Sequence, residues 1–161
     1  MPAGRVVGLF VKEHVPGEPG LPKQSVPEVE LTPGGVRGDF NNFRTEELQG
    51  DPDSAVLLLP HEILDELRRE GWPVHPGDLG ENVGTRGIAW PDFRPGRTVR
   101  LGRAELRTTR ECTPCERLRY LPYVGNDKLP AFLRATLSRR GWYARVVRPG
   151  STRIGDAIEI D

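Results

Sequence analysis

The chain has 161 residues, a length that predicts a single domain with one core over residues 1–161. Its 23 lysines and arginines balance 23 aspartates and glutamates, so no overall positive field attracts nucleic acid or an anionic membrane. No apolar run approaches ~18 residues and residues 1–14 lack the order of a signal peptide, so we expect a soluble cytoplasmic protein.

The first part of the chain alternates short apolar runs with turns rich in glycine and proline. Residues 4–12 are β-branched and apolar and predict a strand followed by a loop. Residues 25–32 alternate imperfectly, and their proline confines the predicted strand to a sheet edge or a strand start. Residues 33–44 contain three glycines and no regular spacing of apolar residues, which indicates a loop or a very short strand. Residues 54–60 form a continuous apolar run, typical of a strand buried on both faces.

The middle of the chain contains the clearest helical pattern and a hairpin pattern. Residues 61–71 place their apolar side chains on one helical face and end at a glycine, which predicts a helix. Residues 72–90 return to a structured loop, with at most a short strand at 82–85. Residues 96–110 form two alternating runs joined at Gly102, and this pattern predicts a hairpin.

The last part of the chain predicts helical segments followed by strands. Residues 115–121 and 128–141 have helical patterns, and residues 142–150 and 152–160 predict two final strands around a turn. Short strands outnumber helices, and the two types do not alternate strictly. The sequence therefore predicts a mainly β fold, a closed or partly open β-barrel with a few short helices, and not a doubly wound sheet.

Both cysteines lie in one short segment with the spacing Cys112-x-x-Cys115. Two cysteines are too few for a disulfide scaffold in a reducing compartment. Cys115 precedes a predicted helix, whose unpaired amides favour a thiolate, and a thiolate is both a nucleophile and a soft-metal ligand. Two other interpretations of the two cysteines stay open: a buried, unreactive pair and a thiol-disulfide redox couple. The redox motif usually follows the first strand of a βαβ unit, whereas this one follows a hairpin late in the chain. A zinc site would need further ligands, and the three histidines match no zinc pattern.

Two turns combine glycines with acidic residues. Residues 35–40 read GVRGDF and residues 76–83 read PGDLGENV. Backbone amides in such turns can approach an anionic ligand closely. Alternatively, the aspartates accept hydrogen bonds from turn amides, and Glu81-Asn82 ties down its own turn.

Taken in order, these motifs resemble those of the MOSC domain family, found at the C-terminus of molybdenum cofactor sulfurases and as small stand-alone bacterial proteins. The similarity runs through nearly the whole chain. The stretches that carry it are GLPKQSV (20–26), GGVRGDF (34–40), AVLLLPHEILDEL (55–67), VHPGDLGENV (74–83), RPGRTVRLGRAELRTT (94–109), TPCERL (113–118) and RRGWYARVVRPGSTRIGDAIEI (139–160). The resemblance implies a β-barrel in which the cysteine of the Pro-Cys motif, here Cys115, is the functional residue.

The resemblance further implies that the protein handles sulfur or the molybdenum cofactor, molybdopterin. Members similar to the stand-alone type, and relatives in the eukaryotic amidoxime reducing system, reduce N-hydroxylated compounds at a cysteine-ligated molybdenum. This interpretation makes Cys115 the catalytic residue and metal ligand and requires an electron-donor reductase as partner. The alternative is a sulfur carrier or cofactor delivery module, with a persulfide on Cys115 supplied by a sulfur-donor protein and Cys112 as a resolving thiol. A third hypothesis is a ligand-binding barrel that has lost its chemistry.

A bound pterin would need cationic and backbone-amide partners. The resemblance places Lys23 at the family's Pro-Lys position, and we expect it and Arg110 to supply positive charge. The remaining expected contacts are the backbone amides around Gly38, Asp39, Glu81 and Asn82.

The chain departs from the pattern of many small members at two places near the inferred pocket. Residues 40–53 replace a segment rich in histidine and glycine, and Cys112 replaces an arginine three residues before the functional cysteine. Both changes bear on the substrate more than on the fold.

Overall fold

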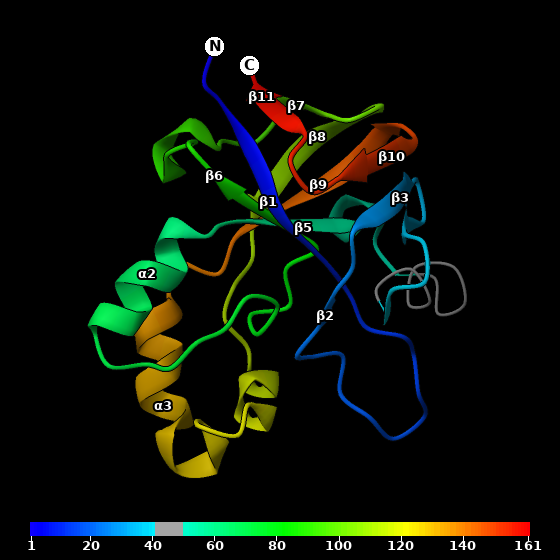
Figure 1. Ribbon diagram of the computed structural model, residues 1–161. Coiled ribbons are helices and arrows are strands. Elements are labelled where there is room, and N and C mark those ends of the chain that lie inside the picture. The colour runs from blue at the N-terminus through cyan, green and yellow to red at the C-terminus, as the bar shows by residue number, and fades with distance from the viewer. Residues whose placement is uncertain (41–49) are drawn as a thin grey trace.

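Seven strands form a closed, mixed β-barrel at the centre of the computed structural model, which describes residues 1–40 and 50–161 (Figure 1). Around the barrel they follow the order β1 (Ala3–Val11), β11 (Ala157–Ile160), β7 (Thr98–Leu101), β8 (Ala104–Glu111), β9 (Trp142–Arg148), β5 (Val56–Pro60) and β6 (Val83–Arg86), which returns to β1. Neighbouring strands are antiparallel, except that β5 and β6 are parallel. The prediction of a mainly β barrel is confirmed, and the barrel is closed.

The remaining elements lie around the barrel. A second sheet contains β10 (Gly150–Arg153), β3 (Glu28–Thr32) and β4 (Gly35–Val36), and β2 (Gln24–Ser25) pairs with the end of β1. The helices in the described residues are α2 (Glu62–Arg69), α3 (Gly125–Thr136) and the 3-10 helices η1 (Pro52–Ser54), η2 (Trp90–Asp92) and η3 (Glu116–Tyr120). Helices α2 and α3 lie together at one end of the molecule, and the two termini lie side by side at the opposite end (Figure 1).

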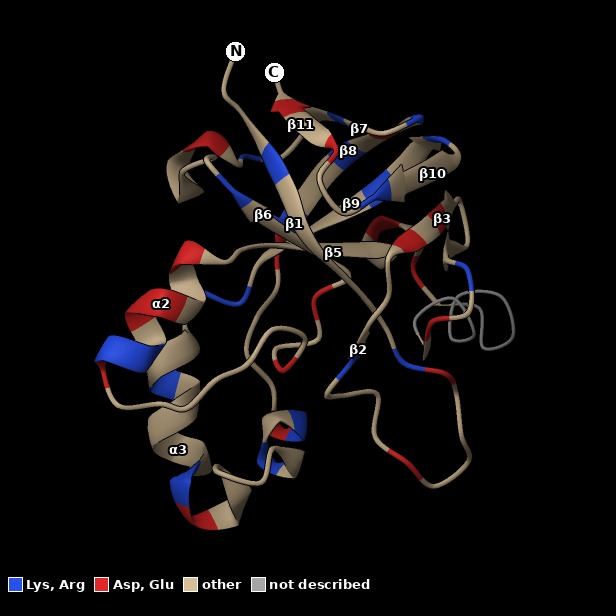
Figure 2. Ribbon diagram, viewed as in Figure 1, with Lys and Arg blue, Asp and Glu red and all other residues tan. Residues whose placement is uncertain are grey.

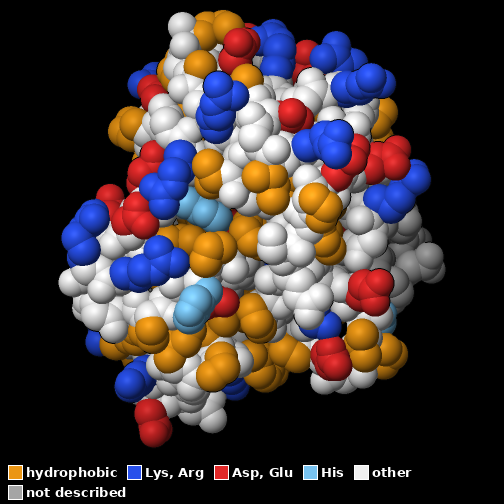
Figure 3. Space-filling view, viewed as in Figure 1, with side chains coloured by type: hydrophobic (Ala, Val, Ile, Leu, Met, Phe, Trp, Pro, Cys, Tyr) orange, Lys and Arg blue, Asp and Glu red, His pale blue; other side chains and the backbone are white. Residues whose placement is uncertain are grey.

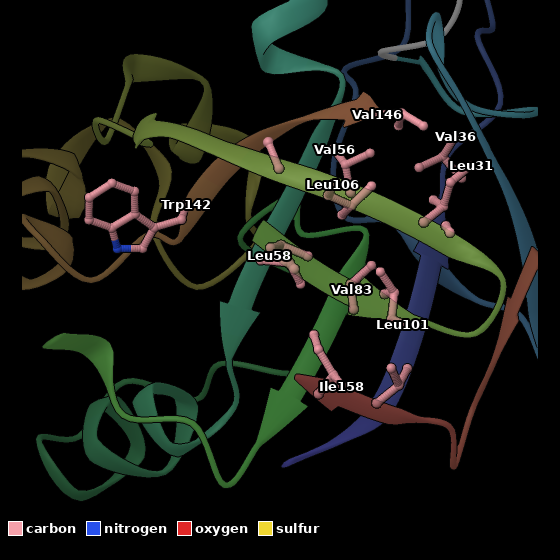
Figure 4. Packing of buried hydrophobic residues seen from close by; sticks show 14 of the residues in the cluster. Leu31, Val36, Val56, Leu58, Val83, Leu101, Leu106, Trp142, Val146 and Ile158 are labelled. Atoms are coloured by element: carbon pink, nitrogen blue, oxygen red, sulfur yellow. The ribbon is translucent and has the colours of Figure 1, made fainter. Parts of the chain in front are cut away.

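Strand β5 connects two hydrophobic clusters, because its side chains alternate between the two faces. Val56 and Leu58 point into the barrel, where they join side chains of all its strands, including Val83 and Ile158 (Figure 4). Leu59 belongs to a second cluster outside the barrel, formed with the helices. Burial on both faces explains why this strand is apolar throughout.

The second cluster fixes the position of η3. Ile63 and Leu67 on the apolar face of α2 pack in one cluster with Phe132 of α3 and Leu118 of η3. Leu118 is fully buried, so η3 is anchored against the helices immediately after Cys115. The chain between β8 and η3 is thereby held at both ends.

The strand and hairpin predictions agree with the structure over residues 4–12, 54–60 and 96–110. The strand predicted over 25–32 is divided into β2 and β3 at Pro27, which lacks the N–H needed for a continuous ladder. The last predicted strand, 152–160, is also divided. Its first part joins the second sheet as β10 and its last part closes the barrel as β11.

The helix predicted over 61–71 is confirmed as α2, but the prediction over 128–141 was wrong at both ends. Helix α3 begins at Gly125 and ends at Thr136. Leu137 already leaves the helical conformation with a ψ of 128°, and Ser138 follows with a left-handed φ of 57°, so the helix ends before Gly141. Residues 137–141 therefore form a connection to β9. In the predicted loop 33–44, β4 is a very short strand, and residues 41–44 lie outside the described residues.

Positively and negatively charged residues are interspersed along the ribbon (Figure 2). On the face shown in Figure 3, charges of both signs surround apolar side chains, which gather across its middle and lower parts. This mixture agrees with the balanced composition. Among the described residues, no helix has the length and apolar character required to cross a membrane.

Candidate active site around Cys115

Cys115 lies where the chain leaves the barrel and enters η3. Its backbone is extended, with φ −131° and ψ 165°, and it is the residue immediately before the first turn of η3. The side chain is half-buried and lines a pocket of about 390 Å³. The thiol is therefore accessible from a pocket large enough to hold a small molecule.

Arg140 provides the positive charge next to this thiol. Its Nη1 atom lies 3.1 Å from Cys115 Sγ, and its Nε atom donates a 3.1 Å hydrogen bond to the Leu79 carbonyl. The Arg140 side chain is buried. A buried guanidinium that also holds a backbone carbonyl has little freedom to turn away, so it is a fixed cation beside the sulfur.

This environment favours the thiolate form of Cys115. Burial by itself would raise the pKa of the thiol, but the charge and hydrogen bond of Arg140 lower it. A hydrogen bond from the Arg117 backbone N–H and the positive charge of that residue act in the same direction. The net result is a pKa below the ordinary value for cysteine, as in nucleophilic and metal-binding thiols.

Arg140 was not among the site residues predicted from the sequence. It lies at the end of the helix predicted over residues 128–141, where the helical pattern alone does not indicate that it reaches a pocket. The glycine that follows Arg140 could have indicated where this arginine lies. Gly141 has a φ of 109°, and a Cβ atom there would lie 2.4 Å from the Leu58 carbonyl oxygen. Only glycine fits this close approach to β5. The backbone is thereby fixed at the residue next to Arg140.

Cys112 is buried, and its thiol donates a 3.4 Å hydrogen bond to the Tyr143 hydroxyl. Both cysteines are free thiols in the structure, and Cys115 is the one that lines the pocket.

Lys23 lines the same pocket, where it is bound to Asp39. Lys23 Nζ lies 2.8 Å from Asp39 Oδ2, and both side chains are almost fully buried. Asn82 donates a 3.1 Å hydrogen bond to Asp39 Oδ2, and the Lys12 backbone N–H donates to Oδ1. Three of the residues selected from sequence, Lys23, Asp39 and Asn82, therefore form one buried network. Gly38, directly before Asp39, has a φ of 84°, which suits the turn.

Glu81 lies in a separate buried pair. Its Oε2 atom is 2.8 Å from His61 Nε2 and accepts a 3.0 Å hydrogen bond from the Gly77 backbone N–H. Its Oε1 atom is buried and has no hydrogen-bond partner among residues 1–40 and 50–161. Glu81 thus holds the turn over residues 77–82, and the Leu79 carbonyl in this turn binds Arg140.

Arg110, the other expected cation, lies outside the pocket lining. Its guanidinium is exposed, 3.2 Å from Asp51 Oδ2, and also contacts the Ser54 hydroxyl. It lies over the ring of Tyr143, with 5.2 Å between guanidinium carbon and ring centroid. Arg110 therefore packs against the ring of Tyr143, which lines the pocket, without lining the pocket itself. Among residues 1–40 and 50–161, no three or more His, Cys, Asp or Glu side chains form a cluster that could hold a metal ion.

Comparison with known families identifies the domain. The family model described as the MOSC domain matches residues 45–159. The chain belongs to the MOSC domain family. Within this MOSC domain, the matched region contains Cys115, Arg140 and every strand of the barrel except β1. A search of curated proteins finds no match.

Solved structures share the fold of this MOSC domain. The YuaD protein from Bacillus subtilis is 22% identical, with a TM-score of 0.79 over 98% of this chain and 95% of that one. YiiM from Geobacillus stearothermophilus is 22% identical, with a TM-score of 0.74 over 99% of this chain and 75% of that one. YiiM from Escherichia coli is 23% identical, with a TM-score of 0.69 over 98% of this chain and 69% of that one.

Proposed function

We propose that this MOSC domain binds the molybdenum cofactor in the Cys115 pocket and reduces N-hydroxylated compounds. The observation that carries the proposal is the position of Cys115, a half-buried thiol in the pocket with the Arg140 guanidinium 3.1 Å from its sulfur. Such a thiolate is a soft ligand that suits a transition metal. Membership of the MOSC family supports the choice of molybdenum.

The pocket residues fit a cofactor of this kind. A metal that arrives on an organic cofactor brings further ligands with it, so one protein thiolate is sufficient. The pocket lining includes the buried cations Lys23 and Arg140, whose positive potential suits the negative charge of a pterin phosphate, together with the aromatic ring of Tyr143. When bound, the cofactor would supply the electron-transfer chemistry, and Cys115 would hold it in place.

The reaction also defines a partner. Reduction of an N-hydroxylated compound takes up two electrons and two protons, breaks the N–O bond and releases water. An electron-donor protein has to supply the electrons. We therefore propose a reductase partner for the loaded protein.

The test is molybdenum analysis of protein purified from a host that makes the cofactor. We expect roughly one molybdenum per chain in the wild type, from the single thiolate ligand, and almost none in Cys115→Ser. Cys112→Ser is the matched control, because it changes the buried cysteine and leaves the pocket thiol. It should keep the metal and the reduction of benzamidoxime to benzamidine by reduced methyl viologen.

Other outcomes would contradict this function. Equal molybdenum in Cys115→Ser would exclude the cysteine as ligand. Metal-free protein carrying sulfane sulfur on Cys115 would instead support the sulfur carrier hypothesis, in which the same thiolate holds a persulfide. Metal-free protein without sulfane sulfur would favour a ligand-binding barrel.

A further inference from the structure

A second hollow adjoins the Cys115 pocket. It has a volume of about 300 Å³ and lies between the loop 17–20 and η3. The two hollows share Gly20, Phe40, Glu116 and Arg117 in their linings. They therefore form one continuous depression, with the reactive thiol in the inner part and the second hollow as an outer part.

The charges in the inner part are already paired. Arg140 lies against Cys115, and Lys23 is held by Asp39 at 2.8 Å. Two carboxylates of the outer hollow also have partners, since Glu18 pairs with Lys12 at 2.6 Å and Glu116 pairs with Arg119 at 3.0 Å.

Arg117 differs from these residues. It is exposed in the wall shared by both hollows, and its guanidinium has no ion pair within the described ranges 1–40 and 50–161. It is therefore the cation at this depression that is available to an anionic ligand.

The outer hollow also offers an aromatic surface. Tyr120 lines it, with 55% of the residue exposed. Its ring makes no contact with another ring among the described residues. An exposed, rigid ring beside a cation suits a planar ligand that carries a negative group.

We propose that the outer hollow binds the body of the substrate, and that the substrates are planar aromatic compounds with an anionic group. Tyr120 contacts the aromatic ring, Arg117 binds the anionic group, and the N-hydroxylated end extends into the inner part near Cys115. The assignment of this ligand as a substrate rests on the proposed reductase function. Arg117 and Tyr120 are binding residues that determine specificity.

The first experiment measures binding to the metal-free chain, so it does not depend on catalysis. The probes are 4-carboxybenzamidoxime and its neutral isostere 4-carbamoylbenzamidoxime, compared by isothermal titration calorimetry. We expect the carboxylate to bind roughly fivefold more tightly, the range of a partly exposed Arg–carboxylate pair. Arg117→Gln should abolish this preference and Arg117→Lys should keep part of it. Arg134→Gln, an exposed arginine on α3 outside both hollows, is the matched control and should keep all of it.

A second pair of variants tests the aromatic contact. Tyr120→Ala should weaken both probes by roughly fivefold, because each loses a ring contact, and Tyr120→Phe should bind both like the wild type. Circular dichroism checks that the variants are folded.

In loaded protein with reduced methyl viologen as donor, Arg117→Gln should raise KM for the carboxylate substrate and leave kcat unchanged. Two viologen radicals supply the two electrons that convert the amidoxime, with two protons, into amidine and water. If carboxylate preference appears in the binding assay but no reduction occurs, the anion site stands and the reductase function fails. Equal binding of both probes to the wild type would overturn the anion site. Loss of molybdenum in Arg117→Gln would overturn it as well, because that result would assign Arg117 to the cofactor.

Discussion

The guanidinium of Arg140 lies 3.1 Å from the sulfur of Cys115, although 25 positions separate the two residues in the chain. Cys115 is placed by η3, and Arg140 is placed by the connection before β9. Their contact stabilises negative charge on a thiol that faces a pocket. On this basis we propose Cys115 as the reactive cysteine of the domain.

Removal of the Arg140 charge should make Cys115 less reactive. In Arg140→Gln the thiol pKa rises, because burial then acts without the compensating cation, and alkylation by iodoacetamide at pH 7 should slow by roughly threefold to tenfold. Arg140→Lys keeps a charge and should slow it less. Alkylation rates followed by mass spectrometry with peptide mapping measure the effect at Cys115. An unchanged rate in Arg140→Gln would show that the guanidinium does not control the thiol.

The lowered pKa of Cys115 also makes stability depend on pH. The folded-state pKa is below the unfolded value of about 8.5, so the folded form releases this proton at lower pH than the unfolded form. The stabilising contribution is therefore fully present above the unfolded pKa and is lost as pH falls through the folded pKa. The free energy of unfolding of the wild type, measured by urea unfolding between pH 6 and 9.5, should therefore rise with pH. In Cys115→Ser the same series should lack this rise, and an identical slope would refute the assignment.

Loss of Asp39 should destabilise the domain strongly. Asp39→Ala leaves the Lys23 ammonium buried without its counter-charge and removes one of the two acceptors of the Asn82 amide, the other being the Phe10 carbonyl. Breaking one partner of a buried pair costs about 3–5 kcal/mol in the free energy of unfolding. As a control, Glu30→Ala breaks the exposed pair with Arg37 and should cost less than about 1 kcal/mol. Urea titration compares the two, and similar losses would contradict the structural role of the Lys23 network.

Gly84 should not tolerate a side chain. A Cβ atom there would lie 2.3 Å from His61 Nε2, so Gly84→Ala displaces the ring and breaks its contact with Glu81. Overpacking of this kind typically costs about 1–3 kcal/mol. His61→Ala also removes the partner of Glu81 but creates space for the methyl group. The cost of Gly84→Ala should therefore be smaller in the His61→Ala background. A double-mutant cycle of unfolding free energies measures this difference. If the effects of the two substitutions simply add, the proposed clash between the alanine methyl group and the His61 ring is excluded.

Local patterns predicted most elements because each rests on neighbouring residues. The hairpin over 96–110 has a glycine at its turn, and the helix over 61–71 has one apolar face and a terminal glycine. The end of α3 was not predicted, since Leu137 leaves the helical conformation and Ser138 adopts a left-handed one, and neither residue type requires this. The division of 152–160 between two sheets depends on partners that lie far away in the sequence.

In the candidate site, too, some features could be predicted from the sequence and others depended on the tertiary structure. The resemblance pointed to Cys115 over Cys112, and to Lys23, Asp39 and Asn82 as separate contacts for a bound pterin. The structure instead joins the side chains of the last three to one another in a buried network, which the sequence did not predict. The sequence also pointed to Arg110, which the structure places outside the pocket lining. A charged residue in a strand or loop can face water or a pocket, and its neighbours in the sequence do not determine which of the two it faces.

By itself, the sequence determined the mainly β architecture, because hydrophobic periodicity and turn residues act over a few positions. It also identified the segment that contains both cysteines. Only the tertiary structure decided which cation approaches the thiol. Arg140 reaches Cys115 because the antiparallel pairing of β8 with β9 brings the start of β9 beside the end of β8, where the Cys112 N–H donates to the Gly141 carbonyl. Electrostatic control of a thiol depends on distance through space, and that distance is fixed by the packing of the whole barrel.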